Sequence, residues 1–235
     1  MTADDRRADL AGGLDSVRAR MFAACAEAGR DPAEVHLIAV TKFFPATDVR
    51  LLVDLGVHDV GENRDQEARD KLTDPVLDGA DLTRHFIGQL QSNKAASVVA
   101  YADVVHTADR RKLVTALARA AEHQGRRRRV LVQVSLDNAP DRGGAPVADV
   151  PALADAVADQ SALELGGVMA VAPLDADPDA AFSRLWEVAS RVRSDHPQAT
   201  WVSAGMSGDL EAAIRHGATH LRVGSAILGK RPPLR

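Results

Sequence analysis

Eight short apolar runs alternate with helical patterns along the chain, and this alternation constrains the fold more than any other feature. The runs predict strands at residues 37–44, 57–60, 84–90, 103–107, 130–136, 166–173, 200–205 and 220–229, the last with its exit turn. Seven of the eight precede a clear helical pattern, and the average unit is about 29 residues (235 over eight units), close to the ~30 of a strand–helix–strand unit. Such alternation implies a parallel sheet, and eight units are the number that closes a barrel.

We therefore predict an α/β fold, a single (β/α)8 TIM-type barrel with an extra N-terminal helix. The first helix has an apolar stripe at spacings of four and three, formed by Leu10, Leu14, Val17 and Met21. This helix (residues 1–30) would pack outside or beneath the barrel (residues 35–229), with a tail at residues 230–235. No linker divides residues 1–235, so we expect one domain. An open doubly wound sheet is the alternative, but no GxGxxG motif follows the first strand.

Charge and composition exclude several classes of protein. The formal net charge of −4, from 29 basic and 33 acidic residues, argues against a general polyanion binder. The single cysteine, Cys25, cannot form an intramolecular disulfide, which suits a reducing cytoplasm. No apolar run approaches the roughly 20 residues of a membrane helix, and the polar start is unlike a signal peptide. Only 3% of the residues are aromatic, which argues against the stacking surfaces that bind single-stranded nucleic acid. Together, these features lead us to expect a cytoplasmic protein that binds neither nucleic acid nor membrane.

Lys42 ends the first apolar run, LIAVTKFF (residues 37–44). A run without polar members is typical of a strand buried on both faces, and alternation would place Lys42 on the face of Ile38 and Val40. Burying an ammonium group costs free energy unless the group is paired, is solvated or takes part in chemistry. A lysine in such surroundings is a nucleophile that forms Schiff bases with aldehydes. The simpler interpretation is a lysine that marks where the strand reaches the surface.

Polar residues follow several predicted strands, at what would be the carboxyl-terminal, active face of the barrel. Loops after the seventh and eighth strands often bind phosphate in this fold. Here Ser207 and Gly208 would open a helix whose N-terminal amides hold an anion, while Gly224 and Ser225 offer close backbone approach and a hydroxyl. Together with Lys42, this arrangement fits a phosphorylated aldehyde. Taken singly, a helix-cap serine and turn glycines are the simpler interpretation.

Other conspicuous side chains have structural interpretations. His85 and His106 lack metal-ligand spacing, so we predict hydrogen-bonded core histidines and no metal site. The basic run at residues 126–129 lies between a helix-ending glycine and a strand, which predicts a solvated turn. Met169 and Met206 are predicted to fill the barrel.

Four motifs in the same order resemble the pyridoxal-phosphate homeostasis family (YggS/PROSC). They are AVTK (39–42), GENRDQE (61–67), HFIGQLQSNK (85–94) and GMSGDLEAAIRHGATHLRVGSAILG (205–229). The resemblance is collinear from Val35 to Gly229. Members of this family resemble the N-terminal barrel of alanine racemase and bind pyridoxal 5′-phosphate (PLP) as an internal aldimine, so the resemblance implies this cofactor here.

The resemblance also implies roles for individual residues around the PLP ring. Lys42 would be the Schiff-base lysine. Arg222 would lie near the pyridine nitrogen, where a guanidinium keeps that nitrogen unprotonated and weakens the ring as an electron sink. Asn63 would lie beside the ring.

On the phosphate side, the resemblance implies that Ser207, Gly224 and Ser225 hold the phosphate group. Ser203 and Met206 would line the same side of the site. No residue is assigned a catalytic role.

Two departures from the family pattern limit what can be carried over. After the fifth strand, where many members have a lysine, this chain has Asp141, Arg142, Gly143 and Gly144. Arginine cannot form an imine, so a secondary PLP contact at this loop is not implied. The strand ends QVSL where QVN is common, so no polar contact is carried over to Ser135.

The leading hypothesis for function is a PLP carrier that buffers the cofactor, takes part in vitamin B6 homeostasis and transiently contacts apo-enzymes. Alanine racemase needs a tyrosine base from a partner subunit, whereas the only tyrosine here, Tyr101, lies in the helix after the third strand. The alternatives are a PLP-dependent enzyme with weak racemase-like activity and a PLP-free barrel enzyme that acts on a sugar phosphate through Lys42. A monomer is expected, because one barrel completes the site.

Overall fold

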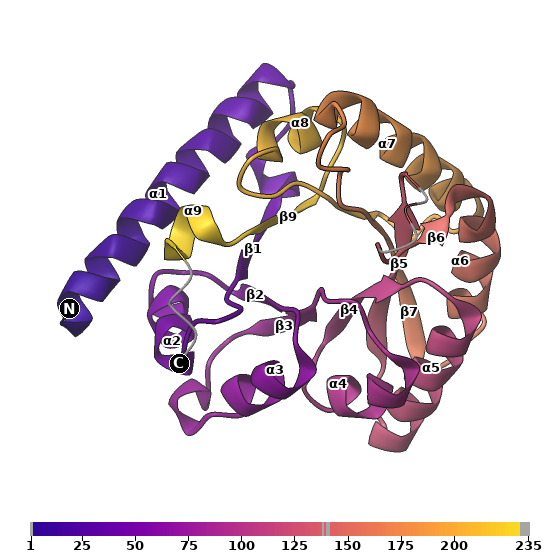
Figure 1. Ribbon diagram of the computed structural model, residues 1–235, viewed down its shortest axis with the longest axis horizontal. Coiled ribbons are helices and arrows are strands. Elements are labelled where there is room, and N and C mark those ends of the chain that lie inside the picture. The colour runs from indigo at the N-terminus through magenta and orange to yellow at the C-terminus, as the bar shows by residue number, and fades with distance from the viewer. Residues whose placement is uncertain (1, 138, 140–141, 231–235) are drawn as a thin grey trace.

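The described part of the chain forms a closed parallel barrel (Figure 1). The computed structural model describes residues 2–137, 139 and 142–230. Each strand pairs in parallel with its neighbour, and pairings of β9 with β1 and of β4 with β5 close the ring. The eight strands are β1 His36–Val40, β2 Asp59–Glu62, β3 Thr83–Phe86, β4 Val104–Ala108, β5 Arg128–Ser135, β7 Leu163–Met169, β8 Trp201–Ser203 and β9 His220–Val223. The predicted TIM-type barrel is confirmed.

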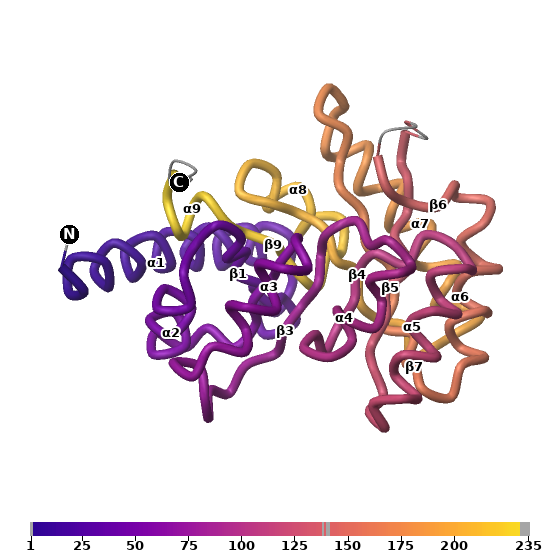
Figure 2. Tube along the Cα trace, turned by 60° about the horizontal axis from the view of Figure 1, so that its bottom comes forward, coloured from indigo at the N-terminus to yellow at the C-terminus, as the bar shows by residue number. Residues whose placement is uncertain are grey.

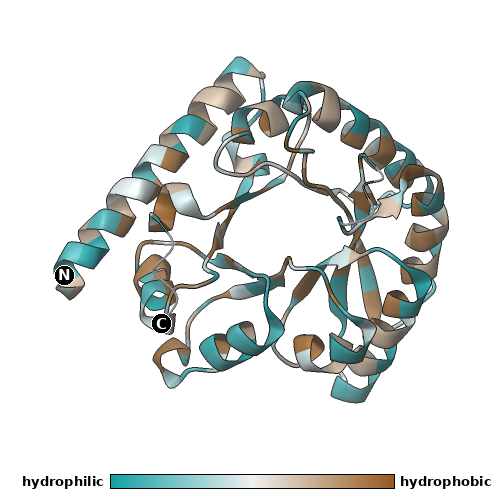
Figure 3. Cartoon of the chain, in the orientation of Figure 1, coloured by the Kyte–Doolittle hydropathy of each residue, from teal (hydrophilic) through white to brown (hydrophobic). Residues whose placement is uncertain are grey.

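Helices follow the strands and cover the outside of the barrel (Figure 1). They are α2 Ala46–Asp54, α3 Asp65–Leu72, α4 Ala95–Tyr101, α5 Arg111–Gln124, α6 Val150–Ala158, α7 Pro178–Asp195, α8 Leu210–Arg215 and α9 Ser225–Leu228. Hydrophilic residues gather on the outward sides of α3, α5 and α7 (Figure 3). A two-residue strand, β6 Ala145–Pro146, pairs with the end of β5 outside the closed ring. Short 3-10 turns occupy Pro32–Glu34, Pro75–Leu77, Ser92–Lys94 and Val147–Asp149.

The first helix, α1 Ala3–Glu27, packs outside the barrel against α8 and α9, as predicted (Figures 1 and 2). Thr2 caps it, because its hydroxyl accepts the Asp5 N–H while the Asp5 carboxylate accepts the Thr2 N–H. The predicted apolar stripe is buried. A Cβ on Gly13 would lie 2.6 Å from the carbonyl oxygen of Ile227, so glycine is what allows α1 and α9 to approach so closely. Within the described residues, no helix has the length and apolar character needed to cross a bilayer.

Several predicted strands were too long or shifted. The largest corrections are to residues 37–44 (β1 ends at Val40), 57–60 (β2 is Asp59–Glu62), 84–90 (β3 ends at Phe86), 166–173 (β7 is Leu163–Met169), 200–205 (β8 is Trp201–Ser203) and 220–229 (β9 ends at Val223 and α9 follows). The strands predicted at 103–107 and 130–136 are shifted by one or two residues, to Val104–Ala108 and Arg128–Ser135. Apolar residues continue past the strand ends, buried as at Leu90 or half-buried as at Phe44, so an apolar run alone overestimates strand length. Of the predicted tail, residues 231–235 lie outside the described residues.

Candidate cofactor-binding site

The carboxyl ends of β8, β9 and β1 lie side by side, which brings the segments that follow them to one sector of the barrel mouth. Ala39 of β1 is in register with Val223 of β9. A Cβ on Gly224 would lie 3.2 Å from the carbonyl oxygen of Val40. Gly224 therefore lies beside Val40, the last residue of β1, and Lys42 follows Val40 two residues later in the chain.

The hydroxyls predicted to hold phosphate meet beside this point. Ser225 Oγ lies 3.3 Å from Ser207 Oγ, and the Ala226 N–H donates to Ser207 Oγ at 3.4 Å. Ser225 is exposed and Ser207 is half-buried, so this pair is open to a ligand from solvent. The structure thus brings Ser207, Gly224 and Ser225 together.

The predicted helix start at Ser207 is wrong, because α8 begins at Leu210. Residues 206–209 form a turn in which the Met206 N–H donates to Asp209 Oδ1 at 2.6 Å. The acidic side chain thereby takes up an amide that a helix start would have offered to an anion. Met206 is 37% exposed and so does not fill the barrel, whereas Met169 is buried there as predicted.

Lys42 is half-buried in a turn that is anchored on both sides. On one side, Lys71 Nζ donates to the carbonyl oxygen of Thr41 at 2.7 Å. On the other, the Phe43 N–H donates to Glu67 Oε1, and Phe43 has a φ of 70°. A left-handed conformation is unfavourable for a phenylalanine and persists only where the surroundings enforce it. The turn therefore fixes the direction in which Lys42 leaves the backbone.

A buried ion pair supports this turn from below. Lys71 Nζ lies 2.7 Å from Glu62 Oε1, and their side chains are 6% and 0% exposed. The Thr41 hydroxyl donates to the same carboxylate oxygen at 2.6 Å. Burial raises the pKa of Glu62, while Lys71 and the Thr41 hydroxyl oppose the rise. Lys71 was not predicted as part of the site; the one local signal was its i,i+4 spacing from Glu67.

Arg222 is buried in the barrel interior, where Nη2 donates to the carbonyl oxygen of Ala170 at 2.8 Å and Nη1 donates to Ser203 Oγ at 2.7 Å. Burial lowers the pKa of Arg222 to about 10. It still carries its positive charge at neutral pH. Ser203, predicted to line the phosphate side, contacts this guanidinium, and its place relative to a phosphate stays a prediction.

A hydrogen-bonded chain continues from Arg222 through the barrel. It runs from Ser203 Oγ to His106 Nδ1 (3.0 Å), from His106 Nε2 to His85 Nδ1 (2.9 Å) and from His85 Nε2 to Asp59 Oδ1 (2.9 Å). His85 and His106 are thus hydrogen-bonded core histidines, as predicted.

The direction of this chain follows from its two ends. Arginine can only donate, so Ser203 Oγ accepts from Arg222 and its own proton is available for His106 Nδ1. Burial lowers the pKa of His106 well below its usual value, so its ring is neutral and carries the proton on Nε2. His106 then donates to His85, and His85 Nε2–H donates to the Asp59 carboxylate. The reverse direction would set a bare ring nitrogen against that carboxylate.

Asn63 follows β2, and its Oδ1 is buried with no hydrogen-bond partner among the described residues. The Asn63 backbone packs directly against Gly88, because a Cβ on Gly88 would lie 2.1 Å from the Asn63 carbonyl oxygen. Only glycine leaves room for this contact. An unpaired buried acceptor is costly, so this amide is a candidate for contact with a ligand.

We expect Gly88→Ala to displace the segment at Asn63 and to weaken PLP binding by roughly tenfold or more, since a clash with backbone cannot be relieved by side-chain motion. The measurement is a PLP titration followed by absorbance. Gly12→Ala is the control, because a Cβ on Gly12, an exposed residue of α1, would meet nothing within 4 Å. Equal PLP affinity in the two variants would contradict this role for Gly88.

The loop after β5 is described only in part, since Asp141 lies outside the described residues. Arg142 Nη2 donates to the carbonyl oxygens of Val171 and Ala172 at 3.1 and 3.0 Å, and Nη1 pairs with Asp137 at 3.0 Å. Arg142 therefore ties this loop to the segment after β7.

Comparison with known proteins identifies first the type of barrel and then the family to which the chain belongs. The family model of the alanine racemase N-terminal domain matches residues 14–232. The pyridoxal phosphate homeostasis protein of Mycobacterium tuberculosis (strain H37Rv) is 45% identical over 245 residues, covering 97% of this chain and 95% of that protein. Its counterpart from Escherichia coli (strain K12) is 36% identical over 231 residues, covering 95% and 97%. The chain belongs to the pyridoxal phosphate homeostasis protein family, as its four motifs predicted.

Solved structures agree with this assignment. The structure of PipY from Synechococcus elongatus, with PLP bound, has a TM-score of 0.81 at 34% identity and covers 94% of this chain and 100% of its own. Alanine racemase from Corynebacterium glutamicum has a TM-score of 0.68 at 16% identity, with 94% of this chain and 63% of that chain covered. The second likeness shows the shared barrel fold alone.

Proposed function

We propose that the chain binds PLP at the carboxyl-terminal mouth of the barrel, through a Schiff base with Lys42, and acts as a PLP carrier and buffer in vitamin B6 homeostasis. The observation that carries this proposal is that the anchored turn with Lys42 follows β1, while the Ser207–Ser225 hydroxyl pair follows the neighbouring strands β8 and β9, at the same end of the barrel. The PLP-bound PipY relative supports it. PLP supplies an aldehyde for the lysine, a ring and a phosphate.

The residues predicted to form the site fit such a ligand in chemical type. The buried and unpartnered Oδ1 of Asn63 offers an acceptor beside the ring. Arg222 offers a guanidinium that can donate but cannot supply a carboxylate's charge, so a pyridine nitrogen beside it stays unprotonated. An unprotonated ring withdraws electrons weakly, which suits retention of the cofactor rather than carbanion chemistry. The hydrogen-bonded chain to Asp59 would hold Arg222 in this orientation.

The phosphate would lie at the other end of the site. Ser207 and Ser225 present paired hydroxyls there, and Gly224 allows close backbone approach beside the end of β1. Ser203 and Met206 remain proposed as neighbours of the site.

The carrier role is favoured over racemisation by the position of the tyrosine. Tyr101, the chain's only tyrosine, lies at the end of α4 with its hydroxyl 3.5 Å from Asp65 Oδ1. Burial raises the pKa of this phenol far above its usual value, so it stays protonated at neutral pH and is not available to accept a proton. A racemase requires a second acid/base group on the face of the ring opposite the lysine.

The experiment that separates the two functions uses protein loaded with PLP and incubated with L-alanine. We expect PLP to be bound and released reversibly, with no D-alanine formed at enzyme-like rates of about 1 per second. Chiral chromatography of the amino acid and absorbance of the bound cofactor are the measurements. Racemisation at that rate would overturn the carrier proposal in favour of a PLP-dependent enzyme.

We further propose that the carrier acts as a cytoplasmic monomer comprising one domain, with PLP as its ligand and apo-enzymes as transient partners. Cys25 is a free, buried thiol, which suits a reducing compartment. Because the candidate site is built from one barrel, sedimentation at increasing protein concentration is expected to give a constant monomer mass with or without PLP.

A further inference from the structure

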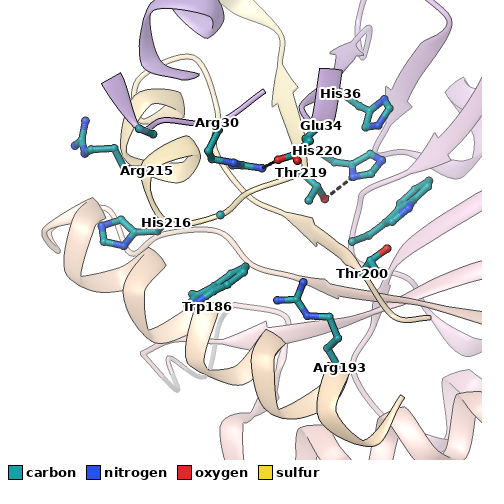
Figure 4. A pocket seen from close by; sticks show the side chains of 13 residues that line it. Arg30, Glu34, His36, Trp186, Arg193, Thr200, Arg215, His216, Thr219 and His220 are labelled. Atoms are coloured by element: carbon teal, nitrogen blue, oxygen red, sulfur yellow. Dashed lines mark hydrogen bonds and ion pairs between the residues drawn. The ribbon is translucent and has the colours of Figure 1, made fainter. Parts of the chain in front are cut away.

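A cavity of about 660 Å³ lies at the amino-terminal end of the barrel, where β1, β8 and β9 begin, whereas Lys42 follows the carboxyl end of β1. Figure 4 shows this cavity from close by. Its walls come from the starts of β1, β8 and β9, from α7 and from the end of α8. The volume falls within the roughly 300–1,000 Å³ of small-molecule sites and is far larger than a bare ion needs. None of the residues proposed to bind PLP lines it.

Tryptophan is concentrated at this cavity. The chain has two tryptophans, and both Trp186 and Trp201 line it. Trp186 is 39% exposed, yet its ring packs directly on Gly217, where a Cβ would lie 2.5 Å from Trp186 Cε3. Gly217 has a φ of 83°, a conformation that favours glycine. A large apolar side chain that is both exposed and fixed is typical of a binding surface.

Arg193 extends along the exposed indole. Its guanidinium carbon lies 4.8 Å from the centre of the Trp186 ring (Figure 4). No ion pair joins Arg193 to an acidic residue in the described part of the chain. Stacking pre-organises the planar guanidinium and leaves its N–H groups available at the edge, a geometry suited to carboxylate or phosphate.

The other arginines of the cavity are already neutralised. Arg30 lies 3.7 Å from Glu34, and Arg215 lies 2.8 Å from Asp179. Arg193 therefore leaves one positive charge in excess. This charge attracts an anion and would repel a cationic ligand.

A stack of rings forms a further wall. His220 lies between Trp201, at 3.7 Å between ring centres, and His36, at 4.8 Å. Burial lowers the pKa of His220 to about 2, so it contributes a neutral ring rather than a charge. His36 is exposed at the cavity, where its ring offers a flat surface to a ligand (Figure 4).

We propose that this cavity binds a small organic anion. The phosphate or carboxylate group of the ligand pairs with Arg193, and its planar body lies in the cavity among the aromatic side chains that line it. The site is separate from the PLP site and does not depend on it.

The two tryptophans make the test direct, because both report on this cavity. Wild-type and Lys42→Ala proteins are titrated while tryptophan fluorescence is followed. The probes are AMP (planar body and phosphate), benzoate (planar body and carboxylate), adenosine (planar body alone) and inorganic phosphate (anion alone). We expect a saturable change with AMP or benzoate in both proteins, and binding at least tenfold weaker with adenosine and with inorganic phosphate.

The assignment to Arg193 is tested with two variants on the same helix. Arg193→Gln is expected to weaken binding of the effective probe by about tenfold or more. Arg191→Gln removes the same charge from α7, but its exposed side chain borders a different depression, so affinity should change less than twofold. The proposal is overturned by any of three results: no saturable change with AMP or benzoate, equal affinity in Arg193→Gln, or inorganic phosphate binding as tightly as AMP. Because Lys42→Ala retains the signal, the outcome is independent of PLP binding.

Discussion

Lys42→Ala is expected to abolish the visible absorbance band of bound PLP and to weaken PLP binding by roughly a hundredfold, or about 2.8 kcal/mol. In the proposed Schiff base, the lysine nitrogen would attack the aldehyde of PLP, and the C=N bond would form with release of water. Alanine leaves the anchors of the turn in place, because Thr41 and Phe43 are held through their backbone atoms. The variant should therefore fold normally. The measurements are absorbance spectra and equilibrium dialysis.

The matched control is Lys94→Ala. Lys94 lies in the QSNK stretch after β3, its side chain is 54% exposed, and Nζ is 4.0 Å from Asp65. Loss of this distant, weak pair should leave both the band and the affinity unchanged. A band that persists in Lys42→Ala, or disappears in Lys94→Ala, would move the site away from Lys42.

Lys71→Met is expected to destabilise the protein by about 3–5 kcal/mol, because it leaves the Glu62 carboxylate buried without its counter-ion. Glu62 is fully buried, and Lys71 also donates to the Thr41 carbonyl. The same change should therefore loosen the turn that carries Lys42 and weaken PLP binding. Urea unfolding at pH 7 measures the free energy of unfolding. Lys94→Met is the control and should cost less than 1 kcal/mol.

The loss in Lys71→Met should depend on pH in a defined direction. Burial raises the pKa of Glu62 in the folded state, and removal of Lys71 raises it further. A raised carboxyl pKa means that the folded state binds more protons than the unfolded state, so stability is present below the unfolded pKa and falls as pH rises. We expect the variant to lose less stability at pH 5 than at pH 8. The additional change Glu62→Gln should flatten this dependence and restore part of the loss.

If Lys71→Met were as stable as wild type at pH 8, Glu62 would not depend on Lys71 for its charge. The buried pair would then have no part in fixing the turn at Lys42.

The barrel could be predicted from the sequence because strand–helix alternation is a local pattern repeated eight times. Strand ends could not be predicted, since apolar residues continue past them, as at Phe43, which lies in the turn after β1 with a φ of 70°. Pairing of Ser207 with Ser225 followed from the fold, because the loops after neighbouring strands must meet. The helix start at Ser207 was wrong because Asp209 caps a turn instead.

The hydrogen bonds that fix Arg222 could not be predicted, because they join residues far apart in the chain. The hydrogen-bonded chain from Arg222 to Asp59 uses side chains from β9, β8, β4, β3 and β2. Each of its members, seen alone, is a polar residue in an apolar strand with no sign of its partner. Only the closed barrel brings them into contact across its interior.

The measurement that tests the central claim most directly is borohydride reduction of the PLP-loaded wild-type protein, followed by peptide mapping. Reduction converts a Schiff base into a stable secondary amine and so marks the lysine that held the cofactor. We predict a single phosphopyridoxyl label, on the peptide that contains Lys42. A label on Lys94 or another lysine, or no label on a protein that has bound PLP, would contradict the account.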